Sequence, residues 1–442
     1  MDLNIRQIFA QVKERVPEMA FDREFILLKD WQGPEVPAWL QGRTLYEIYV
    51  RAFSEAGTFK GVTERLPELK ELGIDVVWLM PIYPIGQQNR KGRWGSPYAI
   101  RDYFNVNPEY GTAADFRTLV QTAHAMSMKV VIDMVPNHVA PDYVALQDQP
   151  HLIARDAQGR PRRKVADWSD IVDLDYGNAR TREHMAQVMK FWIDEFDVDG
   201  YRCDVAGFVP LDFWEWVVPQ LKEKKHDFYL LAEWESPRLH RVFHSTYDWS
   251  TLRLLRRAFH GEVALLARWI LAKQLMYPQN ALPLRFLENH DLPRARTIFP
   301  GEQWAAALTV LFSLHGLPLI YNGQEWGASA TPSLFERQPI ERNESDERFL
   351  RITQKLIGLR KKHPALSSGQ YSFFDTALRD NVLVFDKGNT LRVMVNFSPH
   401  PLPPDPKWFG DVKDVLFNSR GDEQSLEQME ALKPYQAVIL NK

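Results

Sequence analysis

The feature that most constrains this 442-residue chain is an alternation of short apolar runs with longer amphipathic stretches. The apolar runs are rich in Val, Ile and Leu, which is typical of parallel strands buried on both faces. The stretches between them have the periodicity of amphipathic helices. Because two parallel strands need a crossover connection, this alternation predicts consecutive βα units and a parallel sheet.

The number of runs points to a closed barrel. Seven runs fit barrel strands, and they lie at residues 45–50, 76–80, 130–135, 200–205, 229–233, 283–287 and 318–321. An eighth strand is needed between the fifth and sixth of these, and its best candidate is 242–247. Helical patterns follow most of the runs, at 62–72, 114–126, 180–196 and 304–315. The pattern predicts an α/β fold, a (β/α)₈ TIM barrel, which takes about 250 residues or more.

The chain is longer than such a barrel needs, and its pattern changes after a helical segment at 351–363. Short alternating runs follow at 371–374, 382–385, 391–395, 415–417 and 437–440, separated by turn residues. This predicts a C-terminal antiparallel β domain. We expect the barrel in residues 1–365, with a short insertion at about 139–172 after the third strand, and the β domain in residues 366–442.

Composition and charge exclude several classes of function and site. The formal net charge is −3, whereas nucleic-acid binding needs a concentrated basic face. No run of about eighteen apolar residues occurs, so we expect no membrane span. The first residues lack the apolar stretch of a secretion signal, and we expect a cytoplasmic protein. Cys203 is the one cysteine, which excludes an internal disulfide and a thiol-based metal site.

Several predicted strands end in carboxylates or other polar groups. The third continues into Asp133 and His138, the fourth into Asp204, the fifth into Glu233 and the seventh into Asp291. In a parallel barrel all these ends face one mouth, so the side chains converge although they are far apart in the sequence. A single aspartate at a strand end is more often a helix cap. Their joint occurrence on successive strands favours an active site.

Converging carboxylates of this kind suit the cleavage of glycosidic bonds. One carboxylate attacks or stabilises the anomeric carbon, and a second must be protonated to release the leaving oxygen. Crowding of like charges raises the pKa of one of them. Arg202 precedes Asp204 by two residues and therefore lies on the same face of its strand, where it can keep Asp204 ionised.

Four segments resemble the signature regions of the α-amylase family of glycoside hydrolases, in order and in approximate spacing; they are residues 133–138, 200–204, 232–233 and 286–291. Residues 46–53 and 73–81 resemble the family's first two strands, and 316–327 its eighth. Tyr98, with 102–103 and 110–112, is similar to the segment that supplies a stacking tyrosine. The resemblance covers most of residues 40–370, and the tail fits the family's C-terminal β domain.

This resemblance implies roles for individual residues. Asp204 would be the catalytic nucleophile, Glu233 the acid/base and Asp291 the stabiliser of the transition state. The substrate-binding residues would be Tyr98, beneath the sugar ring, and Arg202, His138 and His290. Asp133 and Asn137 would have structural roles in the first signature region.

The sequence departs from the family's pattern after the nucleophile. Many α-amylases have a Lys-His pair there, and this chain has Ala206, Gly207 and Phe208. The insertion is also short beside the domain that commonly holds calcium. Asn137 offers one candidate oxygen, whereas calcium takes about six to eight. We therefore expect no required cofactor and no metal site, with calcium as an alternative that these residues do not support.

The resemblance implies a retaining hydrolase that cleaves α-1,4-glucosidic bonds in starch-type glucans or maltooligosaccharides through a covalent intermediate on Asp204. Two alternatives stay open. One is a transglycosylase, or an enzyme acting on sucrose, trehalose or α-1,6 linkages, with the same machinery. The other is a non-catalytic glucan-binding homologue, which the retention of all three carboxylates disfavours. The sequence does not determine the linkage, endo or exo cleavage, or the oligomeric state.

Overall fold

A computed structural model of the chain describes residues 4–15, 21–340, 342, 347–375, 378, 381–403, 405–421 and 429–442. Its centre is a barrel of eight parallel strands, each hydrogen-bonded to its neighbours in the order β8-β7-β6-β3-β2-β1-β10-β9. A parallel bridge between Tyr247 and Leu284 joins the two outer strands and closes the sheet. The predicted (β/α)₈ fold is therefore confirmed. The strands are β1 (Leu45–Ile48), β2 (Val76–Leu79), β3 (Lys129–Met134), β6 (Gly200–Cys203), β7 (Tyr229–Ala232), β8 (Ser245–Thr246), β9 (Leu284–Arg285) and β10 (Leu317–Tyr321).

Strand β8 lies inside 242–247, the segment predicted to supply the remaining barrel strand, and is shorter than that segment. The residues before it leave the sheet because they follow a 3₁₀ turn, η5 (Arg238–Arg241). The ring of His244 then replaces a strand carbonyl, since its Nδ1 accepts the backbone N–H of Leu230 at 3.0 Å. The sheet therefore begins at Ser245 rather than at Val242.

Helices surround the barrel, and their ends follow local sequence signals. Thr112 and Asp115 form a reciprocal capping box at the start of α4, and Gly73 ends α3 with a φ of 100°, which glycine adopts without a steric cost. Across the described residues, no helix combines the length and the apolar character needed to cross a membrane. The helices are α1 (Ile5–Lys13), α2 (Val50–Phe53), α3 (Phe59–Leu72), α4 (Ala113–Ala125), α5 (Ala179–Phe196), α6 (Leu211–Lys224), α7 (Trp249–Ala258), α8 (Val263–Met276), α9 (Ala295–Ile298), α10 (Glu302–Ser313) and α11 (Arg348–Lys362).

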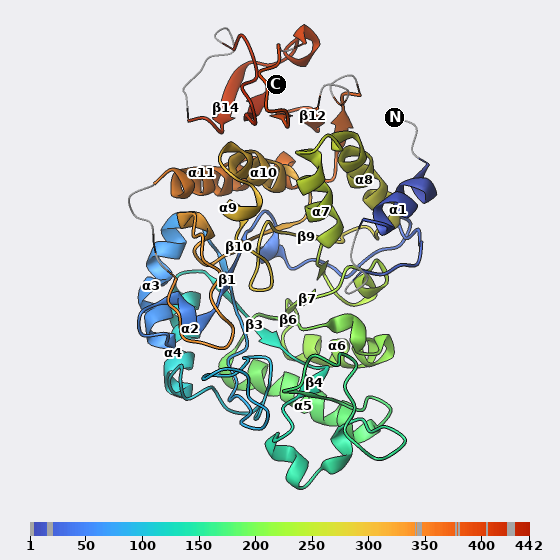
Figure 1. Cartoon of the computed structure of the whole chain (residues 1–442), viewed down its shortest axis with the longest axis vertical. Helices are drawn as coiled ribbons and strands as arrows, with labels where there is room; N and C mark the ends of the chain where they lie inside the picture. The colour runs from blue at the N-terminus through green and yellow to red at the C-terminus, as the bar shows by residue number, and fades with distance from the viewer. Residues whose placement is uncertain are drawn as a thin grey trace.

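The insertion after β3, here called the excursion (residues 139–172), carries a small sheet of its own. Strand β4 (His138–Val139) pairs antiparallel with β5 (Val172–Asp173), and two 3₁₀ turns lie between them, η2 (Val144–Gln147) and η3 (Pro150–Leu152). This short sheet returns the chain to the barrel directly beside His138. In Figure 1 the excursion lies at one end of the molecule and the C-terminal sheet at the other.

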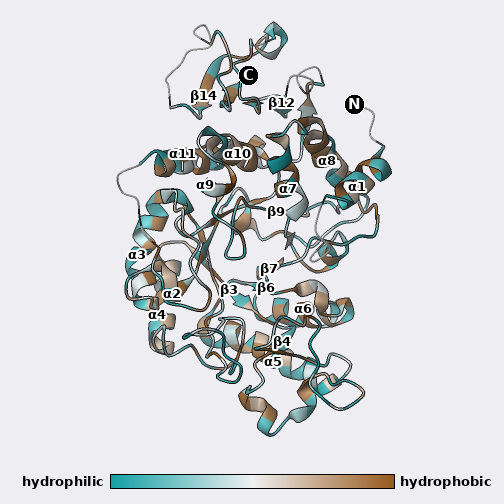
Figure 2. Cartoon of the chain, viewed as in Figure 1, coloured by the Kyte–Doolittle hydropathy of each residue, from teal (hydrophilic) through white to brown (hydrophobic). Residues whose placement is uncertain are grey.

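The C-terminal region forms the predicted antiparallel sheet, and its five strands lie in the order β11-β12-β13-β15-β14. One face joins the main hydrophobic core through Phe385 and Val393, and the other has a small core of its own around Trp408. Helices α8 and α10 lie between this sheet and the barrel, and both are hydrophobic along most of their length (Figure 2). The strands are β11 (Tyr371–Phe373), β12 (Val382–Lys387), β13 (Leu391–Asn396), β14 (Asp414–Asn418) and β15 (Ala437–Asn441).

Candidate active site

The carboxyl ends of the barrel strands open onto a pocket of about 240 Å³. Six of the seven side chains predicted for the site line it: Tyr98, His138, Asp204, Glu233, His290 and Asp291. The seventh, Arg202, is fully buried beneath them. The structure therefore brings together residues that lie up to two hundred positions apart in the sequence, as the barrel geometry requires.

Arg202 organises the floor of this pocket. Its Nη1 donates to Asp204 Oδ1 at 2.8 Å and to both carboxylate oxygens of Asp133, at 2.9 and 3.1 Å. Its Nη2 lies 2.9 Å from Oε1 of Glu233. One guanidinium is thus shared by three carboxylates. Because the guanidinium is planar and rigid, it fixes Asp204 and Glu233 relative to each other.

The backbone after Asp204 also contributes to this arrangement. Val205 has a φ of 37°, a left-handed conformation that β-branched residues rarely adopt. In that conformation its N–H donates to Glu233 Oε2 at 2.8 Å. Strained backbone of this kind clusters at functional sites. Here it connects the backbone after Asp204 to the side chain of Glu233.

The electrostatics of the cluster follow from burial and crowding. Burial is the largest effect on each carboxyl; Arg202 opposes it, and the neighbouring carboxylates add to it. As a result the pKa of Glu233 rises to about 8, that of Asp133 to about 7 and that of Asp204 to about 6. At neutral pH Glu233 therefore favours the protonated form and Asp204 the ionised form, the division that an acid and a nucleophile need.

The two predicted histidines differ in charge. Burial lowers the pKa of His138 to about 4, so its ring is neutral. Burial has the same tendency at His290, but Asp291 and Glu47 outweigh it and raise the pKa of His290 to about 9. His290 Nε2 lies 3.3 Å from Asp291 Oδ2, and Nδ1 contacts Glu47. His290 is a cation beside Asp291, which is the most exposed of the three predicted catalytic carboxylates.

Tyr98 is half-buried at the side of the pocket. Its ring stacks on His290 with centroids 5.4 Å apart and an interplanar angle of 19°. Its hydroxyl donates to Asp133 Oδ2 at 3.2 Å and lies 2.7 Å from His290 Nε2. The tyrosine is therefore held at both its ring and its hydroxyl, and its remaining surface lines the pocket.

Sequence reasoning missed several residues of this site. Glu47, on β1, lies within a segment that had been matched to the family but had no assigned role; it anchors His290. The excursion contributes Trp168, whose ring lies 5.6 Å from that of His138, and Asp170, which pairs with Lys91 at 3.1 Å. A tryptophan inside an otherwise polar segment was the available signal. Phe335 completes the wall from beyond β10.

The donor groups around Asn137 do not fit a calcium site. Asn137 Oδ1, the one candidate oxygen in the sequence, accepts a hydrogen bond of 2.8 Å from the ammonium of Lys164. That ammonium also donates to the carbonyl of Phe208 at 3.1 Å. Calcium prefers six to eight oxygen ligands. Within the described part of the chain, no three His, Cys, Asp or Glu side chains are grouped so that they could hold a metal ion.

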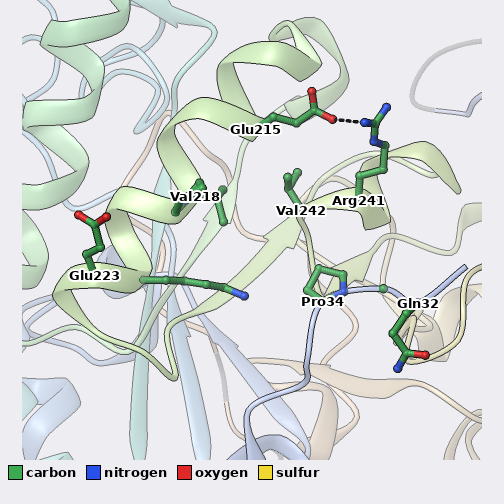
Figure 3. A pocket seen from close by; sticks show the side chains of 10 residues that line it. Gln32, Pro34, Glu215, Val218, Glu223, Arg241 and Val242 are labelled. Carbon is green, nitrogen blue, oxygen red and sulfur yellow. Dashed lines mark ion pairs between the residues drawn. The ribbon is translucent and has the colours of Figure 1, made fainter.

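A second hollow of about 680 Å³ lies on the outer side of α6, beside η5 (Figure 3). Its Glu215 is paired with Arg241 at 2.8 Å, and Val218, Val242 and Pro34 form its apolar surface. None of the residues predicted for catalysis lines it. Its lining also lacks a pair of carboxylates that converge and share one cation, so the pocket at the strand ends is the candidate active site.

The sequence and the fold both match those of known amylases. Residues 39–158 and 164–248 match the family described as the alpha amylase catalytic domain. The fold resembles an alpha-amylase from Lactobacillus plantarum, with 32% identity, a TM-score of 0.81 and coverage of 91% of this chain and 99% of that one. It is equally similar to a maltogenic alpha-amylase from Thermotoga neapolitana, with 33% identity, a TM-score of 0.80 and the same coverage.

An alpha-amylase from Haloarcula japonica is 30% identical over 350 residues, which is 76% of this chain. The match spans about half of that relative, 51% of its length. The two solved structures, by contrast, are covered almost completely, at 99% of each. On the strength of its fold, its strand-end carboxylates and these relatives, the chain belongs to the α-amylase family of glycoside hydrolases.

Proposed function

We propose that this protein is a retaining hydrolase of α-1,4-glucosidic bonds in maltooligosaccharides and starch-type glucans. Asp204 is the nucleophile, Glu233 the general acid and base, and Asp291 the carboxylate that holds sugar hydroxyls in the transition state. Tyr98, Arg202, His138 and His290 position the sugar and the carboxylates. Related proteins are named alpha-amylase, maltogenic amylase and cyclomaltodextrinase, which supports an α-glucan as the substrate.

The observation that carries this proposal is that Asp204 and Glu233 line one pocket at the strand ends and contact the same guanidinium. Burial raises the pKa of Glu233 to about 8 and that of Asp204 to about 6, while both contact the same guanidinium. A retaining glycosidase needs one carboxyl that can give a proton and one that can attack, about 5–5.5 Å apart. A shared guanidinium favours a separation of that order.

The proposed reaction has two steps. Asp204 attacks the anomeric carbon while Glu233 gives its proton to the leaving oxygen, so a glycosyl–Asp204 ester forms and the shortened glucan departs with a free hydroxyl. Glu233, now ionised, takes a proton from water, which attacks the same carbon. The ester bond breaks and Asp204 is regenerated. Each step inverts the anomeric carbon, so the product has the configuration of the substrate.

The test is to incubate the protein with maltoheptaose and to follow the anomeric protons by NMR from the first seconds. The α-anomer should appear first and equilibrate slowly with the β-anomer. If the β-anomer appears first, the mechanism is inverting and the assignment of Asp204 is wrong. An absence of any cleavage would favour a non-catalytic glucan-binding protein instead.

A substrate panel decides between the open alternatives. It contains starch, pullulan, a cyclodextrin, sucrose and trehalose, each analysed for product length as well as anomer. Products longer than the substrate would indicate a transglycosylase, because an acceptor sugar then intercepts the intermediate in place of water. Preferential cleavage of sucrose, trehalose or α-1,6 bonds would change the substrate and leave the roles of Asp204 and Glu233 intact.

A further inference from the structure

Lys164, in the excursion, contacts the barrel at two segments that lead to active-site residues. It is exposed at the protein surface, but its ammonium reaches inward to the side-chain oxygen of Asn137, at 2.8 Å, and the backbone carbonyl of Phe208, at 3.1 Å. Asn137 is 1% exposed and immediately precedes His138. Phe208 ends η4 (Ala206–Phe208), the 3₁₀ turn that follows Asp204 and Val205. One side chain therefore joins the excursion to both segments.

The contact sets the orientation of the Asn137 amide. An ammonium has donors only, so it must face the amide oxygen. The amide nitrogen is then directed to the other side, where it lies 3.1 Å from Nδ1 of His138. Because the amide nitrogen can only donate, Nδ1 has to accept. The proton of the neutral imidazole is thereby assigned to Nε2.

That assignment matters because of what Nε2 faces. His138 lines the pocket, and its Nε2 lies 3.9 Å from Oδ2 of Asp204. Burial lowers the pKa of His138 to about 4, so the ring is neutral at the pH of catalysis and one of its two nitrogens has no proton. With the proton on Nε2, the ring presents a donor to the pocket and to Asp204. The other tautomer would direct a lone pair at a carboxylate.

We propose that Lys164 is a positioning residue that acts through Asn137 to hold His138 as the Nε2–H tautomer, so that His138 directs a donor into the substrate pocket on the side that faces Asp204. The partner that orients a functional histidine is commonly a carboxylate or a carbonyl. Here two hydrogen bonds in series, from the Lys164 ammonium to the Asn137 amide and from that amide to the His138 imidazole, fix which ring nitrogen faces Asp204. This inference rests on the proposed function of Asp204 for its catalytic consequence, but not for the tautomer itself.

The experiment has a spectroscopic arm and a kinetic arm. The ring nitrogens of histidine-labelled protein are read by two-bond ¹H–¹⁵N correlation spectra, and the variant His138→Gln identifies the signals of His138. Lys164→Met removes the donor but keeps the length of the side chain, and Lys164→Arg keeps donors. The neighbouring Arg163 is exposed, so Arg163→Met is a control with the same change of charge and a similar change of size.

In the wild-type protein and in Arg163→Met, we expect His138 as a pure Nε2–H tautomer. Lys164→Met should show a mixture of tautomers, and its kcat/KM on maltoheptaose should fall about tenfold, the low end for loss of a partner that orients a histidine. Lys164→Arg should restore most of both. If Lys164→Met does not fold, Lys164→Gln replaces it; its amide can donate or accept, so it should give an intermediate mixture.

Three results would overturn the proposal. These are an Nδ1–H tautomer in the wild type, an unchanged tautomer in Lys164→Met, or a changed tautomer with unchanged kcat/KM. The spectra need no substrate, so the tautomer is tested even if the protein does not hydrolyse α-glucans. Failure of the proposed function would be a wild-type protein without activity, and failure of this inference would be an active protein that is indifferent to Lys164.

Discussion

The chain that leaves β7 carries two glutamates, Glu233 and Glu235, and each belongs to a different cluster of buried charged side chains. The two clusters differ in the balance between carboxylates and cations. Around Glu233, the carboxylates of Asp133, Asp204 and Glu233 share the single guanidinium of Arg202. Around Glu235, the carboxylates of Glu235 and Asp248 face two cations, Lys273 and Arg285. We call these the mouth cluster and the inner cluster.

In the inner cluster, Glu235 and Lys273 find hydrogen-bond partners within the protein. Lys273 Nζ lies 2.8 Å from Glu235 Oε1 and 2.5 Å from Asp248 Oδ1, and the backbone N–H of Ser250 donates to Glu235 Oε2 at 2.8 Å. The mouth cluster has a deficit of positive charge and opens onto a pocket. Burial of charge alone is therefore no sign of catalysis. At the mouth, burial raises the pKa values of the carboxyls, and the excess of carboxylates over cations adds to that effect.

Removing the nucleophile should give the largest effect. Asp204→Ala lacks the attacking atom, so kcat on maltooligosaccharides should fall by about four to six powers of ten, as when other covalent catalysts lose their nucleophile. The thermal midpoint should stay the same or rise, because two carboxylates then share Arg202 instead of three. Calorimetry and initial rates check both. A large loss of stability would place Asp204 in a structural network like that of the inner cluster.

Glu233→Gln should have the next largest effect on activity. Loss of the general acid should reduce kcat on natural oligosaccharides by about two to four powers of ten. On α-glucosyl fluoride, whose leaving group needs little protonation, the first step should keep much of its rate. Equal losses on both substrates would contradict the assigned role.

The pH profile gives a second reading of the same residue. The wild type needs Glu233 protonated and Asp204 ionised, so kcat/KM should fall above pH about 8 and below pH about 6. In Glu233→Gln the alkaline limb should disappear and the acid limb should remain. An alkaline limb that persists in this variant would assign it to another group.

Removing a cation from the inner cluster should lower the free energy of unfolding rather than the catalytic rate. Lys273→Met leaves two buried carboxylates with one cation, and loss of one partner of a buried pair costs about 3–5 kcal/mol of the free energy of unfolding. Activity per folded molecule should change far less than in Glu233→Gln. Arg268 is exposed on the same helix, and Arg268→Met should stay within about 0.5 kcal/mol of the wild type. Equal destabilisation by both variants would show that the helix, not the cluster, is sensitive.

The two clusters also show what could be predicted from the sequence. The barrel, the C-terminal sheet and the convergence of Asp204, Glu233 and Asp291 follow from strand periodicity and from the polar residues at strand ends. The role of Arg202 beside Asp204 follows from the two-residue repeat of a strand. Glu235 occupies the same kind of position after β7 as Glu233, and nothing in its local sequence distinguishes an inner carboxylate from one at the mouth.

What separates these two glutamates is their partners, and those are remote in sequence. Lys273 comes from α8 and Arg285 from β9, and only the closed barrel brings them to Glu235. Glu47 reaches His290 from the opposite end of the chain in the same way. The short strand β8 was hard to locate for a related reason, since the ring of His244 replaces a backbone group there. Long-range pairing of side chains is not encoded in local periodicity.

Tyr98 should show a smaller effect. Tyr98→Phe removes the hydroxyl bonds to Asp133 and His290, whereas Tyr98→Ala also removes the ring that lines the pocket. If the ring supports the sugar, Tyr98→Ala should weaken transition-state binding by about 1–2 kcal/mol in kcat/KM, and Tyr98→Phe by less. The thermal midpoint should change little in Tyr98→Phe. Normal turnover with a strongly lowered midpoint in Tyr98→Ala would instead assign the ring to the core.

The smallest effect should come from removing metal ions, although the mouth cluster has more carboxylates than cations. A divalent cation could balance three carboxylates, but the raised pKa values show that protons can do so as well. The oxygen of Asn137, the one candidate calcium ligand in the sequence, accepts a hydrogen bond from the Lys164 ammonium. We therefore expect kcat/KM and the thermal midpoint to be unchanged after dialysis against EDTA. Loss of activity that calcium restores and magnesium does not would mean that a bound cation balances the carboxylates of the mouth cluster. Both clusters would then be balanced in charge, the mouth cluster by a metal ion and the inner cluster by the side chains of Lys273 and Arg285.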